Sequence, residues 1–275
     1  MVPFRKMHGL GNDFVVFDAR EQAFAVTAEL ARKVADRRFG VGCDTVVMIA
    51  PGNAKTDARL VFFNADGGEV ESCGNASRCV ARFLMDERGL GRVRLDTKGG
   101  LLVCEDAGKG LVRVDMGAPI LDWKEIPLAE AVDTEKSDLT VEGRKLTASF
   151  VSMGNPHCVL FVDQAETAPV TTLGPLLEKH ALFPNRVNVE FAEIKSPSHI
   201  RMRVWERGIG VTLACGTGAC ATLVAAARRG LAGRKAELEL DGGSLTIEWR
   251  QSDGHVVMTG PAATPFIGKL DLRSL

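Results

Sequence analysis

Several features that mark common function classes are scarce in this chain of 275 residues. Tyrosine is absent and only three Trp occur, so we do not expect an aromatic platform for stacking nucleic-acid bases. Lys and Arg number 34 against 35 Asp and Glu, which leaves no basic excess for binding nucleic acid or a membrane surface. The balance of 45% hydrophobic and 25% charged residues excludes disorder and predicts a globular protein with a full core.

The chain also lacks targeting and metal-binding patterns. Residues 1–14 contain no apolar segment of the secretory type. Residues 208–227 are uncharged, but they hold four Gly and three Thr and are too polar for a membrane span. The seven Cys form no Cys-x-x-Cys pair, and the odd count favours reduced thiols. We expect a cytoplasmic protein without a membrane segment or a metal site.

An internal repeat organises the sequence. The Gly-rich segment that begins at Asn64 is followed by Cys73-Gly74, and the one that begins at Glu206 is followed by Cys215-Gly216, with an offset of 142 residues throughout. Glycine pairs elsewhere in the chain repeat at an offset of 143 residues. A near-constant offset predicts two structurally equivalent halves. We place them at residues 1–118 and 119–262, and expect the tail, 263–275, to pack on the first half.

Each half has the same predicted order of elements. A strand enters a Gly-rich turn, and a helix follows the Cys. Apolar residues at i, i+3, i+4, i+7 and i+8 from Ala76 form one buried stripe, whereas residues 219–229 are apolar all round. A helix over 27–38, capped by Thr27, has a counterpart over 172–181. The expected strands are 60–63, 92–96, 101–104, 111–115, 200–205, 237–240, 245–249 and 255–258. The pattern indicates an α+β fold, mostly β with one long buried helix in each half.

Cys73 and Cys215 are the reactive candidates, because each lies just before a predicted helix. The unpaired N–H groups and the dipole at a helix start favour negative charge, so we expect the pKa of these thiols to fall. The same N–H groups can hold a carboxylate, and the small residues Gly74, Gly216 and Gly218 let a ligand approach the backbone.

Two equivalent thiols suggest the inversion of a stereocentre. If the halves pack about a pseudo-two-fold axis, the thiols face one cleft and flank the α-carbon of a bound carboxylate. One thiolate would remove the α-proton, and the opposing thiol would protonate the other face. The alternatives from the residues alone are two buried structural Cys, or a Cys73–Cys215 disulfide that inactivates the protein.

Five motifs resemble the diaminopimelate epimerase family. They are MHGLGNDFVV at 7–16, FNADGGEVESCGN at 63–75, VSMGNPHCV at 151–159, RVNVEF at 186–191 and RVWERGIGVTLACGTGAC at 203–220. The resemblance implies an enzyme that interconverts LL- and meso-2,6-diaminopimelate for lysine and peptidoglycan precursor synthesis, without pyridoxal phosphate or metal. It also implies two like domains, each a mixed or antiparallel β-barrel-like sheet around a central helix, with the active site in the cleft between them.

The resemblance assigns roles to named residues. Cys73 and Cys215 become the acid/base thiols, and His157 and Glu206 set their protonation. The chemistry of Arg207 and Glu206 suits the carboxylate and ammonium at the distal end of the substrate. The residues expected to bind substrate are Asn12, Asn64, Gly74, Asn75, Asn155, Asn188, Glu206, Arg207, Gly216 and Thr217.

Some positions depart from the family pattern. Thr45 stands where many members have Gln, Ala76-Ser77 replaces Gly-Ala, and Val211 stands where many have Glu. These changes keep open an amino-acid racemase of the same fold with another substrate. A thiol-based redox or metal-binding module is a second alternative. Phe266 replaces a Tyr that often supports a dimer interface, which weakens the expectation of a homodimer.

Overall fold

The chain forms two compact units in a computed structural model that describes residues 1–22, 24–71 and 73–275. Unit 1 comprises Met1–Asp115 and Thr259–Leu275, and unit 2 comprises Met116–Met258. Ser72, inside the motif at 63–75, lies outside the described residues. Each unit combines many strands with few helices, and the predicted α+β class is confirmed.

The described residues of unit 1 form two α-helices, one short 3-10 helix and nine strands. The helices are α1 (Ala28–Ala35) and α2 (Gly74–Arg88), followed at the C-terminal end of the chain by the short 3-10 helix η1 (Leu272–Ser274). Its strands are β1 (Val2–Gly9), β2 (Asn12–Asp18), β3 (Thr45–Asn53), β4 (Thr56–Asn64), β5 (Glu69–Val70), β6 (Arg92–Thr97), β7 (Gly100–Asp106), β8 (Leu111–Asp115) and β18 (Ala263–Leu270). The predicted cap is confirmed, because Thr27 accepts a hydrogen bond from the Leu30 amide at the start of α1.

Unit 2 repeats this order. Its helices are α3 (Val170–Glu178) and α4 (Gly216–Arg228). Its strands are β9 (Ser137–Val141), β10 (Arg144–Ser152), β11 (Pro156–Phe161), β12 (Asn188–Ser196), β13 (His199–Glu206), β14 (Gly210–Val211), β15 (Lys235–Leu240), β16 (Gly243–Trp249) and β17 (Val256–Pro261), the last of which continues past Met258 into unit 1. All the predicted strands are present, and the helix predicted over 172–181 is α3.

Strand pairing shows that the two units share one topology. In unit 1, β2 pairs parallel with β3, and β4 pairs parallel with β6. In unit 2, β11 and β12 form the same parallel pair, as do β13 and β15. The register also repeats, since Phe14 lies opposite Thr45 and His157 lies opposite Asn188. The offset of 143 residues therefore relates single positions in the two sheets.

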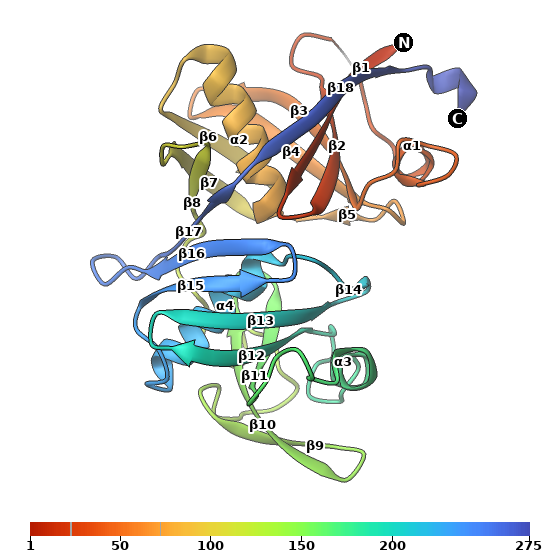
Figure 1. The fold of residues 1–275 in the computed structure, drawn as a ribbon. Helices are drawn as coiled ribbons and strands as arrows, with labels where there is room; N and C mark the ends of the chain where they lie inside the picture. Colours follow the sequence, from red (N-terminus) through yellow and green to blue (C-terminus); the bar gives the residue numbers. More distant parts are fainter. Residues whose placement is uncertain (23, 72) are drawn as a thin grey trace. The chain divides into compact units, whose positions relative to one another are not determined.

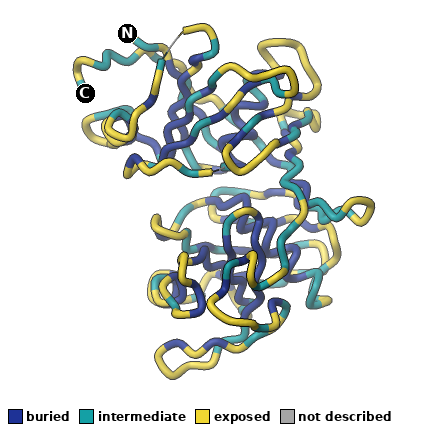
Figure 2. Tube along the Cα trace, turned by 180° about the vertical axis from the view of Figure 1, so that it is seen from behind, coloured by how far each residue is buried: buried dark blue, intermediate teal, exposed yellow. Residues whose placement is uncertain are grey.

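A buried helix lies at the centre of each unit. In unit 1, α2 packs against β1, β2, β6, β7 and β8, and in unit 2, α4 packs against β10 to β13, β15 and β16 (Figure 1). Figure 2 shows that the buried parts of the trace gather inside each unit, whereas the turns are exposed. Gly89 ends α2 in the left-handed conformation, with φ of 64°, as its sequence position predicts.

The C-terminal strand completes unit 1. β18 pairs antiparallel with β1, from Val2 opposite Leu270 to Lys6 opposite Phe266. In unit 2, the corresponding neighbour of β10 is β9, which precedes it directly in the chain. Equivalent places in the two sheets are thus filled from different parts of the sequence. Among the described residues, no helix combines the length and the apolar character needed to cross a membrane.

Candidate active site

Both predicted catalytic thiols occupy the position before a central helix. Cys73 is the N-cap of α2 and Cys215 is the N-cap of α4, both with extended backbone angles. Their carbonyls accept the first intrahelical hydrogen bonds, from Ser77 and Ala219, at 2.9 and 3.0 Å. The N–H groups of the first helical turn point beyond the helix, where they can meet a carboxylate.

The first half-site contains Asn12, Asn64, Cys73, Gly74 and Asn75. Asn12 Oδ1 accepts a hydrogen bond from Asn75 Nδ2 at 3.2 Å and lies 4.0 Å from Cys73 Sγ. Asn64 ends β4, and its carbonyl accepts from the Gly67 amide in the turn that leads toward Cys73. All five residues belong to unit 1.

A carboxylate fixes the amide of Asn12. Asn12 Nδ2 donates to Asp44 Oδ2 at 2.9 Å, so the amide oxygen is turned toward Asn75 and Cys73. Arg37 in turn bridges Asp44 and Asp13 with contacts of 2.8 Å to each.

The second half-site contains Asn155, His157, Asn188, Glu206, Arg207, Cys215, Gly216 and Thr217, all in unit 2. Asn155 Nδ2 donates to Thr217 Oγ1 at 3.2 Å, and Thr217 Oγ1 lies 3.6 Å from Cys215 Sγ. The buried His157 ring places Nε2 at 3.0 Å from Asn155 Oδ1. Its Nδ1 lies 2.7 Å from Glu190 Oε1.

The turn after β13 carries Glu206 and Arg207. Glu206 accepts hydrogen bonds from the Thr212 hydroxyl and from the Cys215 thiol. The Arg207 amide donates to Asn188 Oδ1 at 3.0 Å, and Asn188 Nδ2 donates to the Pro156 carbonyl at 3.0 Å. Asn188 therefore ties this turn to the strand that carries His157.

Comparisons with known proteins identify the family of this chain. The family model described as diaminopimelate epimerase matches residues 4–121 and 149–265, one segment in each half. A diaminopimelate epimerase of Rhodospirillum centenum is 55% identical over 97% of this chain and 91% of its own length. That of Phenylobacterium zucineum is 54% identical over 98% and 97%. The chain belongs to the diaminopimelate epimerase family.

Solved structures with low sequence identity show the same fold. A probable proline racemase from Agrobacterium radiobacter aligns with a TM-score of 0.73 at 16% identity, covering 99% of this chain and 93% of its own. A hydroxyproline epimerase from Agrobacterium vitis aligns with a TM-score of 0.71 at 17% identity, covering 98% and 92%. The epimerase family fold of this chain is thus shared by distant sequences.

The electrostatics of Cys215 overturn one expectation from the sequence. Burial raises the pKa of the Cys215 thiol well above its ordinary value, and the carboxylates of Glu206 and Glu190 raise it further. Hydrogen bonds from Thr217 and the Gly218 amide act in the opposite direction without cancelling this effect. The prediction of a lowered pKa is therefore wrong for Cys215, because desolvation outweighs the helix terminus.

Glu206 responds to the same surroundings. Burial raises the pKa of its carboxyl group, although the hydrogen bonds from Thr212 and Cys215 and the nearby His157 lower it in part. A carboxyl group hydrogen-bonded to a thiol is in a position to exchange a proton with it. The structure thus brings Glu206 next to Cys215, and its role in setting the protonation of the thiols stays a prediction.

Two buried carboxylates near the second half-site were not predicted. Glu190, in β12, contacts His157, and Glu178, in α3, accepts hydrogen bonds from Trp205 Nε1 at 2.7 Å and from the Gly208 amide at 3.0 Å. Both are at most 3% exposed. The sequence pattern set neither apart, because β12 also holds Glu193 and Lys195, and Glu178 is the last residue of α3.

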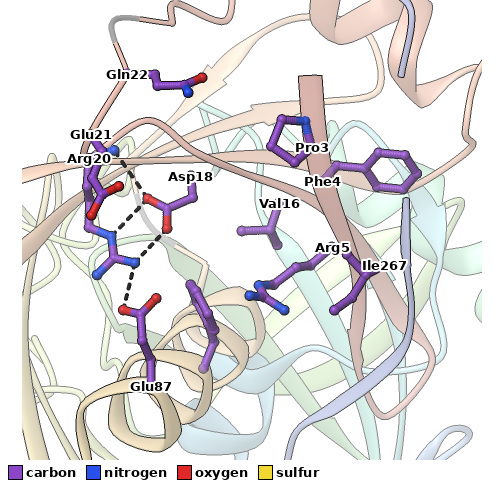
Figure 3. Close-up of a pocket in the computed structure, with 11 residues that line it drawn as sticks. Pro3, Phe4, Arg5, Val16, Asp18, Arg20, Glu21, Gln22, Glu87 and Ile267 are labelled. Atoms are coloured by element: carbon purple, nitrogen blue, oxygen red, sulfur yellow. Dashed lines mark hydrogen bonds and ion pairs between the residues drawn. The ribbon is translucent and has the colours of Figure 1, made fainter. Parts of the chain in front are cut away.

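A cavity of about 270 Å³ lies elsewhere in unit 1. Figure 3 shows Arg20 between Asp18 and Glu87, with Arg5 directed into the same space. The Arg5 guanidinium lies over the Phe83 ring, 4.0 Å from its centroid. None of the predicted site residues lines this cavity.

Proposed function

We propose that this protein interconverts LL- and meso-2,6-diaminopimelate through proton transfer by Cys73 and Cys215. The observation that carries the proposal is the placement of both thiols at the N-cap of the central helix in two units of equal topology. Equivalent acid/base groups suit a reaction whose substrate and product have opposite configurations at one carbon.

The mechanism follows from the state of each half-site. The N–H groups at the starts of α2 and α4 hold the substrate carboxylate and stabilise the charge that develops on its oxygens. In one direction, the Cys73 thiolate takes the α-proton while the Cys215 thiol gives its proton to the opposite face. After this turnover Cys73 carries the proton and Cys215 is the thiolate, and the reverse reaction starts from that state. The mechanism requires both sulfurs to reach the same α-carbon.

The distal end of the substrate supplies the specificity. Arg207 is exposed and offers a guanidinium for the distal carboxylate. Asn64 and Asn188 offer amides, and Glu206 offers a carboxylate for the distal ammonium. This polar set favours a zwitterionic distal end over an apolar ring such as that of proline.

Incubation of the protein with LL-diaminopimelate in deuterated water tests the proposal. One solvent deuterium should enter at the α-carbon as the configuration inverts, and Cys73→Ala and Cys215→Ala should each abolish turnover. Near-normal rates in both single variants would exclude the two-thiol mechanism. Retention of activity after chelator treatment, with loss after alkylation, would separate this function from a metal-binding module.

The same assay separates the substrates. Turnover of other amino acids without turnover of LL-diaminopimelate would assign the chain to an amino-acid racemase and would point to Thr45, Ala76 and Val211 as the cause.

A homodimer is also proposed, because Phe266 and Ile267 on β18 are apolar side chains that are 50% and 63% exposed. Light scattering on the purified protein measures its mass. We place the enzyme in the cytoplasm, in lysine and peptidoglycan precursor synthesis.

A further inference from the structure

A hydrogen-bonded chain runs through the second half-site from a buried carboxylate to the thiol. It passes from Glu190 to His157, from His157 to Asn155, from Asn155 to Thr217 and from Thr217 to Cys215 Sγ, with distances of 2.7, 3.0, 3.2 and 3.6 Å. The thiol then donates to Glu206. Every member belongs to unit 2.

Each link fixes the direction of the next. Both nitrogens of the His157 ring face oxygen acceptors, Glu190 Oε1 and Asn155 Oδ1, and the ring satisfies both only when both nitrogens carry hydrogen. The Asn155 oxygen is thereby occupied, and its N–H group donates to Thr217 Oγ1. The Thr217 hydroxyl is then left to donate its proton to Cys215 Sγ.

The fold itself does not require this chain. The position in unit 1 equivalent to His157 is Phe14, and the position equivalent to Glu190 is Val47, both fully buried and apolar. Glu190 is also fully buried, and its second oxygen, Oε2, accepts no hydrogen bond from the described residues. Replacing a buried ion pair by packed apolar residues is often neutral or stabilising. A purely structural role therefore does not explain Glu190.

We infer that Glu190 is a positioning residue for the proposed reaction: through His157 it orients the Asn155 amide, so that Thr217 donates a hydrogen bond to the Cys215 sulfur. This donor stabilises negative charge on sulfur when Cys215 has released its proton. The inference rests on the proposed two-thiol function. Without the Glu190 carboxylate, the hydrogen bonds of His157 no longer fix the Asn155 amide, which can turn over so that its oxygen takes the Thr217 proton instead.

Unit 1 supports the inference through Asp44. Asp44 takes the N–H of Asn12, which is equivalent to Asn155, and turns the amide oxygen toward Asn75 and Cys73. Asn12 thus presents its amide oxygen to the start of α2, whereas Asn155 presents its amide N–H to the start of α4. A different carboxylate sets each orientation, directly in unit 1 and through an imidazole in unit 2.

A double-mutant cycle between Glu190→Gln and Thr217→Val tests the coupling. Each single variant should lower kcat by about tenfold, the loss expected for one charge-assisted hydrogen bond. The double variant should lose little more than either single variant, because both break the same chain. Independent losses that multiply to about a hundredfold would overturn the inference, as would wild-type activity of Glu190→Gln.

Alkylation of Cys215 by iodoacetamide, followed against pH in the Cys73→Ala protein, gives a readout that does not depend on turnover. Glu190→Gln removes both this donor and a carboxylate that itself raises the pKa of Cys215, so its effect is compared in proteins with Thr217 and with Thr217→Val. With Thr217 present, loss of the donor should displace the profile toward higher pH relative to the shift that Glu190→Gln causes in the Thr217→Val background, where only the charge effect remains. The groups that face Cys215 are Glu206 on β13, Glu190 on β12, Thr217 on α4 and, beyond it, His157 on β11. Equal shifts in the two backgrounds contradict the inference even if the two-thiol function holds.

Two further measurements test the inference without the Glu190→Gln protein, in case that variant does not fold. In the wild-type protein, ¹⁵N spectra should show hydrogen on both ring nitrogens of His157, assigned by their loss in His157→Phe. A single protonated nitrogen would overturn the inference. The pair His157→Phe with Glu190→Val places in unit 2 the residues that unit 1 uses, so it should keep or raise Tm while kcat falls.

Discussion

Trp205 Nε1 donates a hydrogen bond to Glu178 Oε2 at 2.7 Å, which joins the end of β13 to the end of α3. The other oxygen of Glu178 accepts from the Gly208 amide at 3.0 Å and from Arg186 Nη1 at 3.3 Å. Gly208 directly follows Arg207 in the turn. A buried carboxylate on a helix thus holds the turn that presents Arg207.

Glu178→Gln should weaken substrate binding more than chemistry. The Gln side chain keeps only one acceptor oxygen, and its NH₂ group must face a second donor, the N–H of either Trp205 or Gly208. One hydrogen bond is therefore lost, and the turn loosens. We expect KM to rise by about tenfold with a small change in kcat. Steady-state kinetics measure the split, and Glu130→Gln, at an exposed position, serves as the matched control. A fall in kcat at constant KM would contradict this role.

Gly218→Ala should impair turnover because the added methyl group has no room. An ideal Cβ there would lie 2.8 Å from Glu190 Oε1 and 3.3 Å from Cys215 Sγ. Either group must move, and displacement of an acid/base sulfur lowers kcat by about ten- to a hundredfold. Gly91→Ala is the control, since nothing lies within 4 Å of its Cβ position. Equal rates in the two variants would show that the site absorbs the methyl group.

The stability of the fold should fall in alkali. Burial raises the pKa of the Cys43, Cys79 and Cys104 thiols from the ordinary 9.0 to about 12. Between these values the folded chain keeps protons that the unfolded chain releases, so the free energy of unfolding decreases as pH rises from about 9 toward about 12. Urea unfolding at several pH values in this range measures how steeply the free energy of unfolding decreases with pH. Replacing the three Cys by Ala should flatten this dependence, although the variant starts from lower stability.

The opposite dependence is expected in acid for Asp13. Burial raises the pKa of its carboxyl group, but hydrogen bonds from Arg37 and Lys6 outweigh that effect and lower it to about 2. The stabilisation is fully present above pH 3.8 and is lost as pH falls toward 2, with a size on the order of 2 kcal/mol. Asp13→Asn should remove this part of the acid dependence in urea titrations. An unchanged acid limb would show that Arg37 and Lys6 do not stabilise the charge.

The sequence predicted the fold because the repeat and local patterns acted together. Thr27 begins α1, Gly89 ends α2, and the central helices begin directly after Cys73 and Cys215. The protonation of Cys215 was not predictable from its place before a helix. Its pKa depends on carboxylates from two other strands, Glu190 on β12 and Glu206 on β13, which only the folded sheet brings near.

The same limit explains which contacts were missed. Glu190 stood inside a quoted motif, but its partner His157 lies 33 residues earlier and meets it across a parallel strand pair. The orientation of the Asn155 amide depends on that contact. Composition and spacing identify residue types at a site, whereas the direction of a hydrogen bond requires the register of neighbouring strands.

The pairing of β18 with β1 has a consequence for biosynthesis on the ribosome. β1 precedes unit 2 in the chain and β18 follows it, so unit 1 stays incomplete until all of unit 2 has been synthesised. Unit 2 is continuous in sequence, so it can finish folding before the N-terminal unit does. A premature stop codon between unit 2 and β18 would therefore damage the unit whose first segment was translated before unit 2.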